Sequence, residues 1–274
     1  MYNFSMLLDD NTCTNLEGKI KVFNKFHINN IEINDCIDGK KITELNGEEI
    51  EKIRNVLIQY NKKIVLLSCN TDVSYYEYYK TVFRQAHTLG VENVKVGIDL
   101  DCCCYDDTSS CAGRCCSDDT ENSCFQKLAM HLKKIIKLGE SYGIGVLMEN
   151  NSSVSFTHDI EFTGISKEFG LEGIQLVFNP LEYVRLKKHP FFHVFYNSKL
   201  KSSILFLRIN DGLYVDGSPT FPGEGNAEVK EMASAMLARG FKGYFSFSPY
   251  FGSNMDIEQQ AEIIDKFKAL LMKM

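Results

Sequence analysis

The chain has 274 residues, of which 44% are hydrophobic and 24% charged, with a formal net charge of -6. This composition is that of a globular protein rather than a disordered one. The acidic balance argues against a non-specific nucleic-acid binder, and no apolar run approaches the ~20 residues that span a bilayer. The start, MYNFSMLLDDN, lacks a basic segment followed by an apolar one, so we expect a cytoplasmic protein with a small-molecule partner. The oligomeric state is left open.

Short β-branched or aromatic runs recur along the whole chain and are predicted as strands. In chain order they cover residues 4–8, 31–34, 64–69, 94–99, 145–150, 174–179, 204–211 and 243–248. Amphipathic stretches typical of helices precede several of them, at residues 75–90, 126–143, 158–170 and 227–240. Each of these four stretches ends at a glycine, the residue that most often closes a helix in the left-handed conformation.

Eight strands alternating with helices predict a single α/β domain over residues 1–274, a (β/α)8 TIM barrel. A last helix at about residues 256–273 would close the barrel against the first strand. A doubly wound open sheet also alternates strands and helices, but it is usually marked by a glycine-rich phosphate loop, and the sequence has none.

Alternation along each predicted strand separates the side chains that face the helices from those that face the barrel axis. The apolar sets face the helices, which leaves polar residues pointing inward near the strand ends: Lys95, Asp99, Glu149, Asn179, Arg208, Asn210 and Ser248. Enzymes with this fold place their chemistry at that end of the barrel. A structural alternative stays open, in which these residues only cap the barrel through hydrogen bonds.

Four short motifs occur in an order that resembles the xylose isomerase-like TIM barrel superfamily. They are IEIN, YGIGVLMEN, LRIND followed by PGEGN, and RGFKGYFSFS. That superfamily contains sugar and sugar-phosphate isomerases and epimerases and also apurinic-site endonucleases. The resemblance covers essentially the whole chain and implies a barrel that acts on a small polyhydroxy substrate. Glu32, within IEIN, matches a common feature of the family's second strand.

The resemblance also implies a divalent cation held by Glu, Asp, His and Glu at the ends of strands five to eight. The matching positions here are Glu149, Asn179, Arg208 and Ser248, so a single family ligand is kept. Arginine cannot ligate a cation, and a serine hydroxyl is a poor ligand. Family members shuttle a proton between two glutamates, and Ser248 cannot take the second role. We therefore expect an eroded metal site and name no metal ligand, although Glu149 could still contact a divalent cation.

We hypothesise that Glu149 and Arg208 pair across the barrel, with the guanidinium in place of the cation, and name both as catalytic candidates. The substrate-binding candidates are Lys95, Asp99, Asn179, Asn210, Glu224 and Ser248. Glu224 is included because PGEGN resembles a family loop beside the substrate. Alternatively, that loop only starts a helix, with Asn226 as its N-cap. Two functions stay open: an isomerase or epimerase-like enzyme, and a catalytically inactive barrel that binds or senses a small molecule.

Residues 101–124, which follow the fourth predicted strand, contain seven of the ten cysteines. Reduced thiols, disulfides formed under some conditions, and a zinc or other soft-metal site are the three interpretations of this loop. Cytosolic thiols are kept reduced, which disfavours the disulfides. Paired Cys-x-x-Cys motifs, the usual mark of a zinc site, are missing from the segment.

Overall fold

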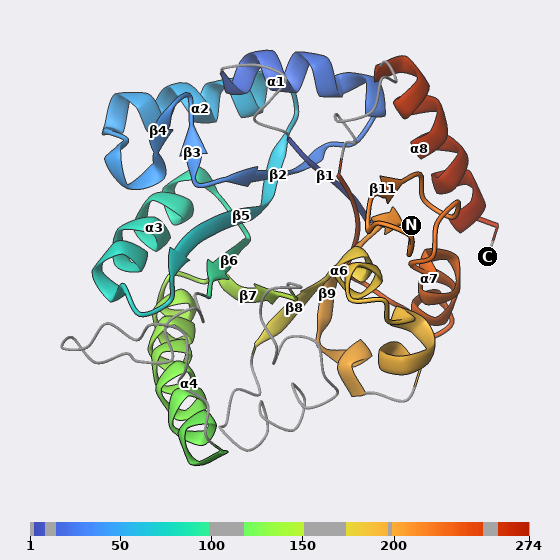
Figure 1. Ribbon diagram of the computed structural model, residues 1–274. Helices are drawn as coiled ribbons and strands as arrows, with labels where there is room; N and C mark the ends of the chain where they lie inside the picture. Colours follow the sequence, from blue (N-terminus) through green and yellow to red (C-terminus); the bar gives the residue numbers. More distant parts are fainter. Residues whose placement is uncertain are drawn as a thin grey trace.

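The computed structural model describes residues 3–8, 15–98, 118–150, 174–196, 199–248 and 257–273, with the side chains of 118–126, 193–194 and 199–200 left out. Within these ranges eight parallel strands close into a barrel with helices around it (Figure 1). The strands are β1 (Asn3–Leu7), β2 (Asn30–Asn34), β5 (Lys63–Asp72), β6 (Asn93–Gly97), β7 (Gly145–Glu149), β8 (Gln175–Phe178), β9 (Ile204–Arg208) and β12 (Tyr244–Phe247). Their order around the barrel is β1-β12-β9-β8-β7-β6-β5-β2. The predicted TIM barrel is confirmed, with all eight strands in the expected segments.

Of the seven α-helices that the described ranges place around the barrel, four correspond to predicted stretches, at 75–90, 126–143, 227–240 and 256–273, and three were not predicted. The seven are α1 (Leu16–Phe23), α2 (Gly47–Gln59), α3 (Tyr76–Leu89), α4 (Asp118–Ser141), α6 (Pro180–Arg185), α7 (Val229–Leu237) and α8 (Ile257–Leu271). Gly90, Gly143 and Gly240 have φ of 73°, 68° and 72°, the left-handed conformation expected where each helix ends. The helix predicted at 158–170, with its Gly170, lies outside the described residues.

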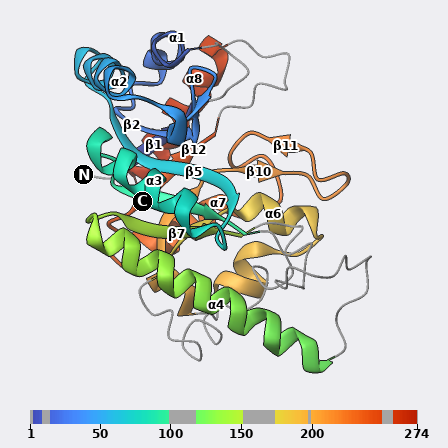
Figure 2. The same cartoon turned by 90° about the vertical axis from the view of Figure 1, so that its left-hand side faces the viewer.

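The prediction is wrong at the start of α4, which begins at Asp118 instead of residue 126. The last part of the cysteine-rich segment is therefore helical, not loop. Acidic residues are favoured in the first turn of a helix, and the sequence DDTEN at its start is consistent with this preference. Figure 2 shows α4 lying along the outside of the barrel, beyond β7.

Two short hairpins interrupt the βα repeat, and neither was predicted. One joins β3 (Cys36–Ile37) to β4 (Lys40–Lys41), with Asp38 and Gly39 both at positive φ. The other joins β10 (Asp211–Gly212) to β11 (Pro219–Thr220), directly after β9. In Figure 2 the second hairpin projects outward from the barrel. Both follow the C-terminal end of a barrel strand and so border the end where a site is expected.

Apolar side chains fill the inside of the barrel below the polar residues. Val65, Leu66, Leu147, Val177 and Phe206 form a buried cluster separate from the large core between strands and helices. Phe206 stacks on Tyr244, with ring centroids 4.7 Å apart. Because inward residues alternate along a strand, the residues two positions beyond Leu147 and Phe206, namely Glu149 and Arg208, form the next layer up.

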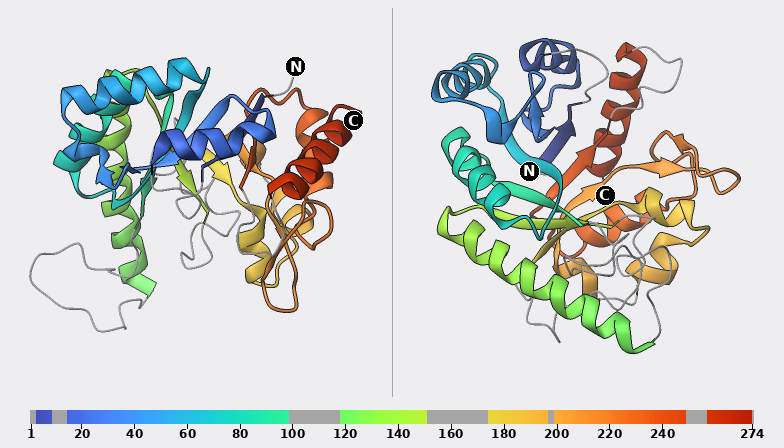
Figure 3. Two further views of the ribbon diagram at one scale, coloured as in Figure 1. Left: turned by 90° about the horizontal axis from the view of Figure 1, so that it is seen from above. Right: turned by 60° about the vertical axis from the view of Figure 1, so that its left-hand side comes forward.

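The last helix closes the molecule on its first segments, as predicted. In Figure 3, α8 lies next to the N-terminal strand and helix, and Lys268 donates a hydrogen bond to the carbonyl of Phe26 at 3.0 Å. Lys25 and Glu258 form an ion pair across the same contact. None of the helices in the described ranges has the length and apolar character needed to cross a bilayer.

Candidate functional site at the C-terminal end of the barrel

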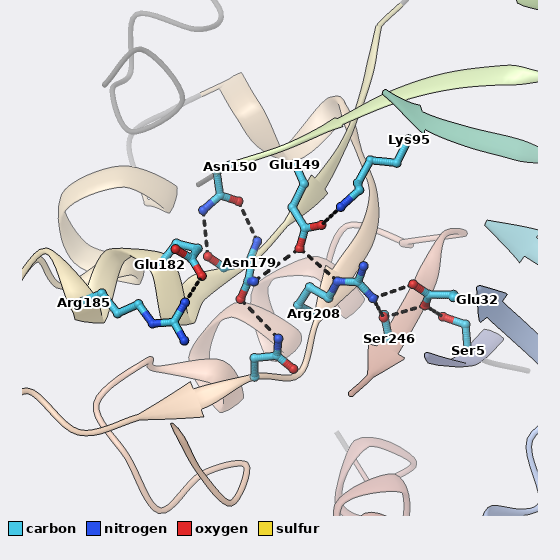
Figure 4. A network of polar contacts seen from close by, with 11 residues as sticks. Ser5, Glu32, Lys95, Glu149, Asn150, Asn179, Glu182, Arg185, Arg208 and Ser246 are labelled. Carbon is cyan, nitrogen blue, oxygen red and sulfur yellow. Dashed lines mark hydrogen bonds and ion pairs between the residues drawn. The ribbon is translucent and has the colours of Figure 1, made fainter. Parts of the chain in front are cut away.

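Arg208, at the end of β9, lies between two carboxylates inside the barrel (Figure 4). Its Nε donates to Glu149 Oε1 at 3.2 Å, and its Nη1 donates to Glu32 Oε2 at 2.5 Å. The residue is only 3% exposed, so this charge is almost fully removed from water. The pair between Glu149 and Arg208 proposed from strand alternation is therefore present, with Glu32 as a second partner.

Glu32 reaches Arg208 across two intervening strands, β1 and β12. Each of these strands has a serine at the crossing point. Ser5 and Ser246 both donate to Glu32 Oε1 at 2.6 Å, and Ser246 also accepts from Arg208 Nη1 at 2.6 Å. Two small hydroxyls thus leave room for the long side chains to meet and satisfy a carboxylate that is 0% exposed.

Glu149, at the end of β7, is the more accessible of the two carboxylates. Its Oε2 accepts from Lys95 Nζ at 2.9 Å, and the side chains of Lys95 and Glu149 are 19% and 16% exposed. Lys95 comes from the neighbouring strand β6 and points inward as predicted. We call Ser5, Glu32, Lys95, Glu149, Arg208 and Ser246 the axial network. It contains two carboxylates and two cations, so its charges balance.

The axial network keeps Glu149 ionised. Burial alone would raise the pKa of this carboxyl, but the charges of Arg208 and Lys95, together with their hydrogen bonds, outweigh burial and lower the pKa to about 2. Burial would likewise lower the pKa of Arg208, but Glu149 and Glu32 raise it above its ordinary value. Both groups are therefore fixed as ions at neutral pH.

Asn179 continues the site from the end of β8. Its Nδ2 donates to Glu149 Oε1 at 3.3 Å, and its Oδ1 accepts from Asn210 Nδ2 at 3.4 Å. The side chain of Asn150 holds the backbone of Asn179 at both its N–H and its carbonyl, each at 2.7 Å. Asn179 and Asn210 are each 8% exposed, so these amides form a buried extension of the axial network.

Asp211 organises the loop that follows β9, a role the sequence did not reveal. It is 1% exposed, and its carboxylate accepts hydrogen bonds from four backbone N–H groups, those of Gly212, Gly223, Gly225 and Ala227, at 2.8 to 3.1 Å. A Cβ at Gly225 would come within 2.3 Å of Asp211 Oδ1, which explains the glycine. The PGEGN loop is therefore fastened to the end of β9.

Glu224 does not join the axial network, although it lies within this loop. Its side chain is exposed, and its backbone N–H bonds to Phe221. The helix-cap alternative for Asn226 is wrong, because α7 begins at Val229 with Glu228 as its N-cap and Asn226 accepts from the backbone N–H of Tyr214. Asn226 thus joins the two ends of the loop between β9 and α7, residues 209–228, which we call the β9–α7 excursion, instead of starting the helix.

Ser248 and Asp99, the two remaining predicted residues, are not among the side chains that form the axial network or its extension. Ser248 follows the end of β12 and is partly exposed, while Ser246, two residues earlier, occupies the place next to Arg208. Asp99 lies outside the described residues, as does most of the cysteine-rich segment with its thiol, disulfide and zinc interpretations.

The residues at the implied metal position do not fit a divalent cation. Both oxygens of Glu149 are already held by cationic groups, and the Arg208 guanidinium lies between the only two carboxylates of the axial network. A third positive centre there would face the permanent charge of Arg208 without a free carboxylate oxygen. Across the described ranges, no three His, Cys, Asp or Glu side chains gather as a metal site would require.

Comparison with solved structures shows the fold of the xylose isomerase-like barrels. A xylose isomerase-like TIM barrel protein from Mycobacterium smegmatis, solved with magnesium, superposes with a TM-score of 0.69 and 13% identity, over 100% of this chain and 97% of the other. An L-ribulose 3-epimerase gives 0.66 and 12%, over 100% and 95%, and 3-keto-D-glucoside 4-epimerase from E. coli gives 0.66 and 10%, over 100% of both chains. Neither the family models nor the curated protein sequences contain a match.

Proposed function

We propose that this protein is a barrel of the sugar isomerase and epimerase fold that binds a small, uncharged polyhydroxy compound at the C-terminal end of its strands, without metal-assisted proton transfer. Structural similarity to sugar epimerases supports the general kind of ligand. The cytoplasm is the proposed location. The axial network is the observation that carries the proposal, because it fills the barrel end with a charge-balanced set of ions.

The state of Glu149 argues against the enzymatic alternative. A general base works best when its pKa lies near the operating pH. The pKa of Glu149, about 2, lies far below neutrality, so this carboxylate is a weak base for removing a proton from carbon at pH 7. Ser248, at the position of the second family glutamate, cannot return a proton. We therefore assign Glu149 and Arg208 to holding the site together.

The test combines binding with turnover. D-xylose, D-fructose and D-glucose are titrated into the protein and followed by NMR, and the same sugars are incubated with the protein in D2O, with and without Mn²⁺. We expect at least one sugar to bind and none to take up deuterium at carbon, whatever the metal. Deuterium uptake that needs Mn²⁺ and disappears in Glu149→Gln would establish the isomerase alternative instead, and failure of all neutral sugars to bind would refute the proposal.

A further inference from the structure

Asn210 Oδ1 is a buried acceptor for which the described residues provide no donor. It is the one fully buried side-chain oxygen or nitrogen in those ranges without a hydrogen-bond partner. Asn210 follows the end of β9 by two positions and is 8% exposed. A buried polar atom without a hydrogen-bond partner loses its hydration without compensation, and native proteins rarely keep one without a reason.

The axial network fixes which atom of Asn210 is left open. Glu149 is ionised and can only accept, so Asn179 must turn its Nδ2 toward it. The Oδ1 of Asn179 then faces Asn210, which must in turn present its own Nδ2. Rotating either amide by 180° would bring two oxygens together, and the clamp of Asn150 on the Asn179 backbone prevents that residue from moving aside. The open end is therefore an acceptor.

The paired charges of the axial network indicate that the missing donor is uncharged. Each carboxylate of the axial network is paired with a cation, so the network has no unpaired positive group to attract a phosphate or carboxylate. An ammonium donor would bring a third cation close to Arg208 and Lys95. It would also lose its hydration on reaching Asn210, which is only 8% exposed. A neutral O–H group carries neither penalty.

We infer that Asn210 Oδ1 is a specificity-determining contact that accepts a hydrogen bond from one hydroxyl group of an uncharged polyhydroxy ligand. This inference rests on the proposed function and adds to it the residue, the atom and the direction of the hydrogen bond. A ligand whose hydroxyl is replaced by a group that accepts but cannot donate would be rejected, because Asn210 Oδ1 would then be buried against another acceptor.

The experiment is a double-mutant cycle between protein and ligand. Asn210→Leu is nearly isosteric and removes the acceptor, while monofluoro analogues of D-xylose, D-fructose and D-glucose replace one donating hydroxyl at a time. We expect Asn210→Leu to weaken sugar binding by about tenfold or more, and one fluoro analogue to lose a similar factor with the wild-type protein. For that analogue the second loss should vanish in Asn210→Leu, since both changes remove the same contact.

A stability measurement separates binding from folding. Asn210→Leu removes the unpartnered Oδ1 and also the Nδ2 that donates to Asn179 Oδ1, so the urea midpoint should fall by no more than the loss of that one long hydrogen bond explains. Equal sugar affinity of Asn210→Leu and wild type would overturn the inference, leaving a resident water as the partner of Oδ1 and the proposed function intact. Absence of neutral-sugar binding by the wild type would overturn both. Binding lost together with non-cooperative unfolding of Asn210→Leu, or with a much larger fall of its urea midpoint, would indicate a structural role and also count against the inference.

Discussion

Whether Arg208 stabilises the folded protein depends on the two carboxylates that it contacts. A buried ion gains from its partners only as long as every partner is present, because an unpaired buried charge cannot be resolvated. Arg208 has a partner on each side, and Glu32 is the more deeply buried of the two, at 0% exposure. The stability of the barrel end therefore depends on matched charges more than on any single contact.

Arg208→Met should destabilise the protein by about 3–5 kcal/mol, because it leaves Glu32 buried beside two serines without a cation. Glu32→Gln combined with Arg208→Met should recover a large part of that loss. Urea denaturation of Arg208→Met, Glu32→Gln and the double variant measures the difference. If the double variant is as unstable as the sum of the two single changes, Glu32 and Arg208 are not energetically coupled.

Glu149 should give the protein a specific dependence on pH. Its folded pKa of about 2 lies below the ordinary value of 4.5, so its contribution is complete above about pH 4.5 and is lost as the pH falls toward 2. The difference corresponds to about 3 kcal/mol. Glu149→Gln lacks this contribution, and the gap in unfolding free energy between wild type and variant should narrow from pH 5 to pH 3.

The exposed Glu48 on α2 provides the matched control for Glu149. Glu48→Gln should change the unfolding free energy little at any pH in that range, since surface charges contribute little. A gap for Glu149→Gln that stays constant between pH 5 and pH 3 would mean that the neighbouring cations do not hold the carboxylate in its ionised form.

At the scale of elements, the excursion between β9 and α7 depends on one buried carboxylate. Asp211→Asn keeps one acceptor oxygen and replaces the other with an amide nitrogen, so two of the four backbone donors lose their partner. We expect the amides of two of the four residues to exchange with solvent at least about tenfold faster in hydrogen-exchange measurements.

Asp216→Asn is the control within the same excursion. Asp216 is exposed, and its carboxylate accepts from Ser218, whose backbone N–H lies 2.9 Å away, but from none of the four donors of Asp211. Its substitution should leave the exchange rates at Gly223, Gly225 and Ala227 unchanged. Equal effects of the two substitutions would show that the loop is not held by Asp211.

The elements that the sequence revealed are those with a strong periodic signal. The barrel strands carry apolar residues on alternate positions. The same alternation predicted that Lys95, Glu149 and Arg208 point into the barrel. The β3–β4 hairpin was missed because two-residue strands show no periodicity, although its Asp38-Gly39 pair is a known turn signal. The start of α4 was missed because its first residues, DDTENSC, carry no apolar periodicity that would mark a helix.

The partners within the site could not be predicted in the same way. Glu32 and Arg208 are 176 residues apart, and two strands separate them in the barrel. Whether their side chains meet depends on the tilt and stagger of the closed barrel and on the small size of Ser5 and Ser246, which alternation does not specify. Asp211 was missed because its role depends on the path of a loop, not on a pattern.

At the scale of the whole molecule, the barrel has the fold of a xylose isomerase-like protein that was solved with magnesium, and we propose that its own ions leave no place for a metal. Added Mg²⁺ or Mn²⁺ at 5 mM should therefore shift the melting temperature by less than about 1 °C, since a ligand stabilises a protein only by binding its folded state. A shift of several degrees that disappears in Glu149→Gln would contradict the assignment of Arg208 as the occupant of that position.

The charge balance of the axial network also has a kinetic consequence. Opposite charges held 2.5 to 3.2 Å apart cancel over a short distance, so the barrel end projects little field into the solvent. A neutral ligand approaching it is not steered, and its association rate should stay nearly constant as ionic strength rises. Differences in affinity among ligands should then arise from how long each one stays bound, which depends on the hydrogen bonds it forms after arrival.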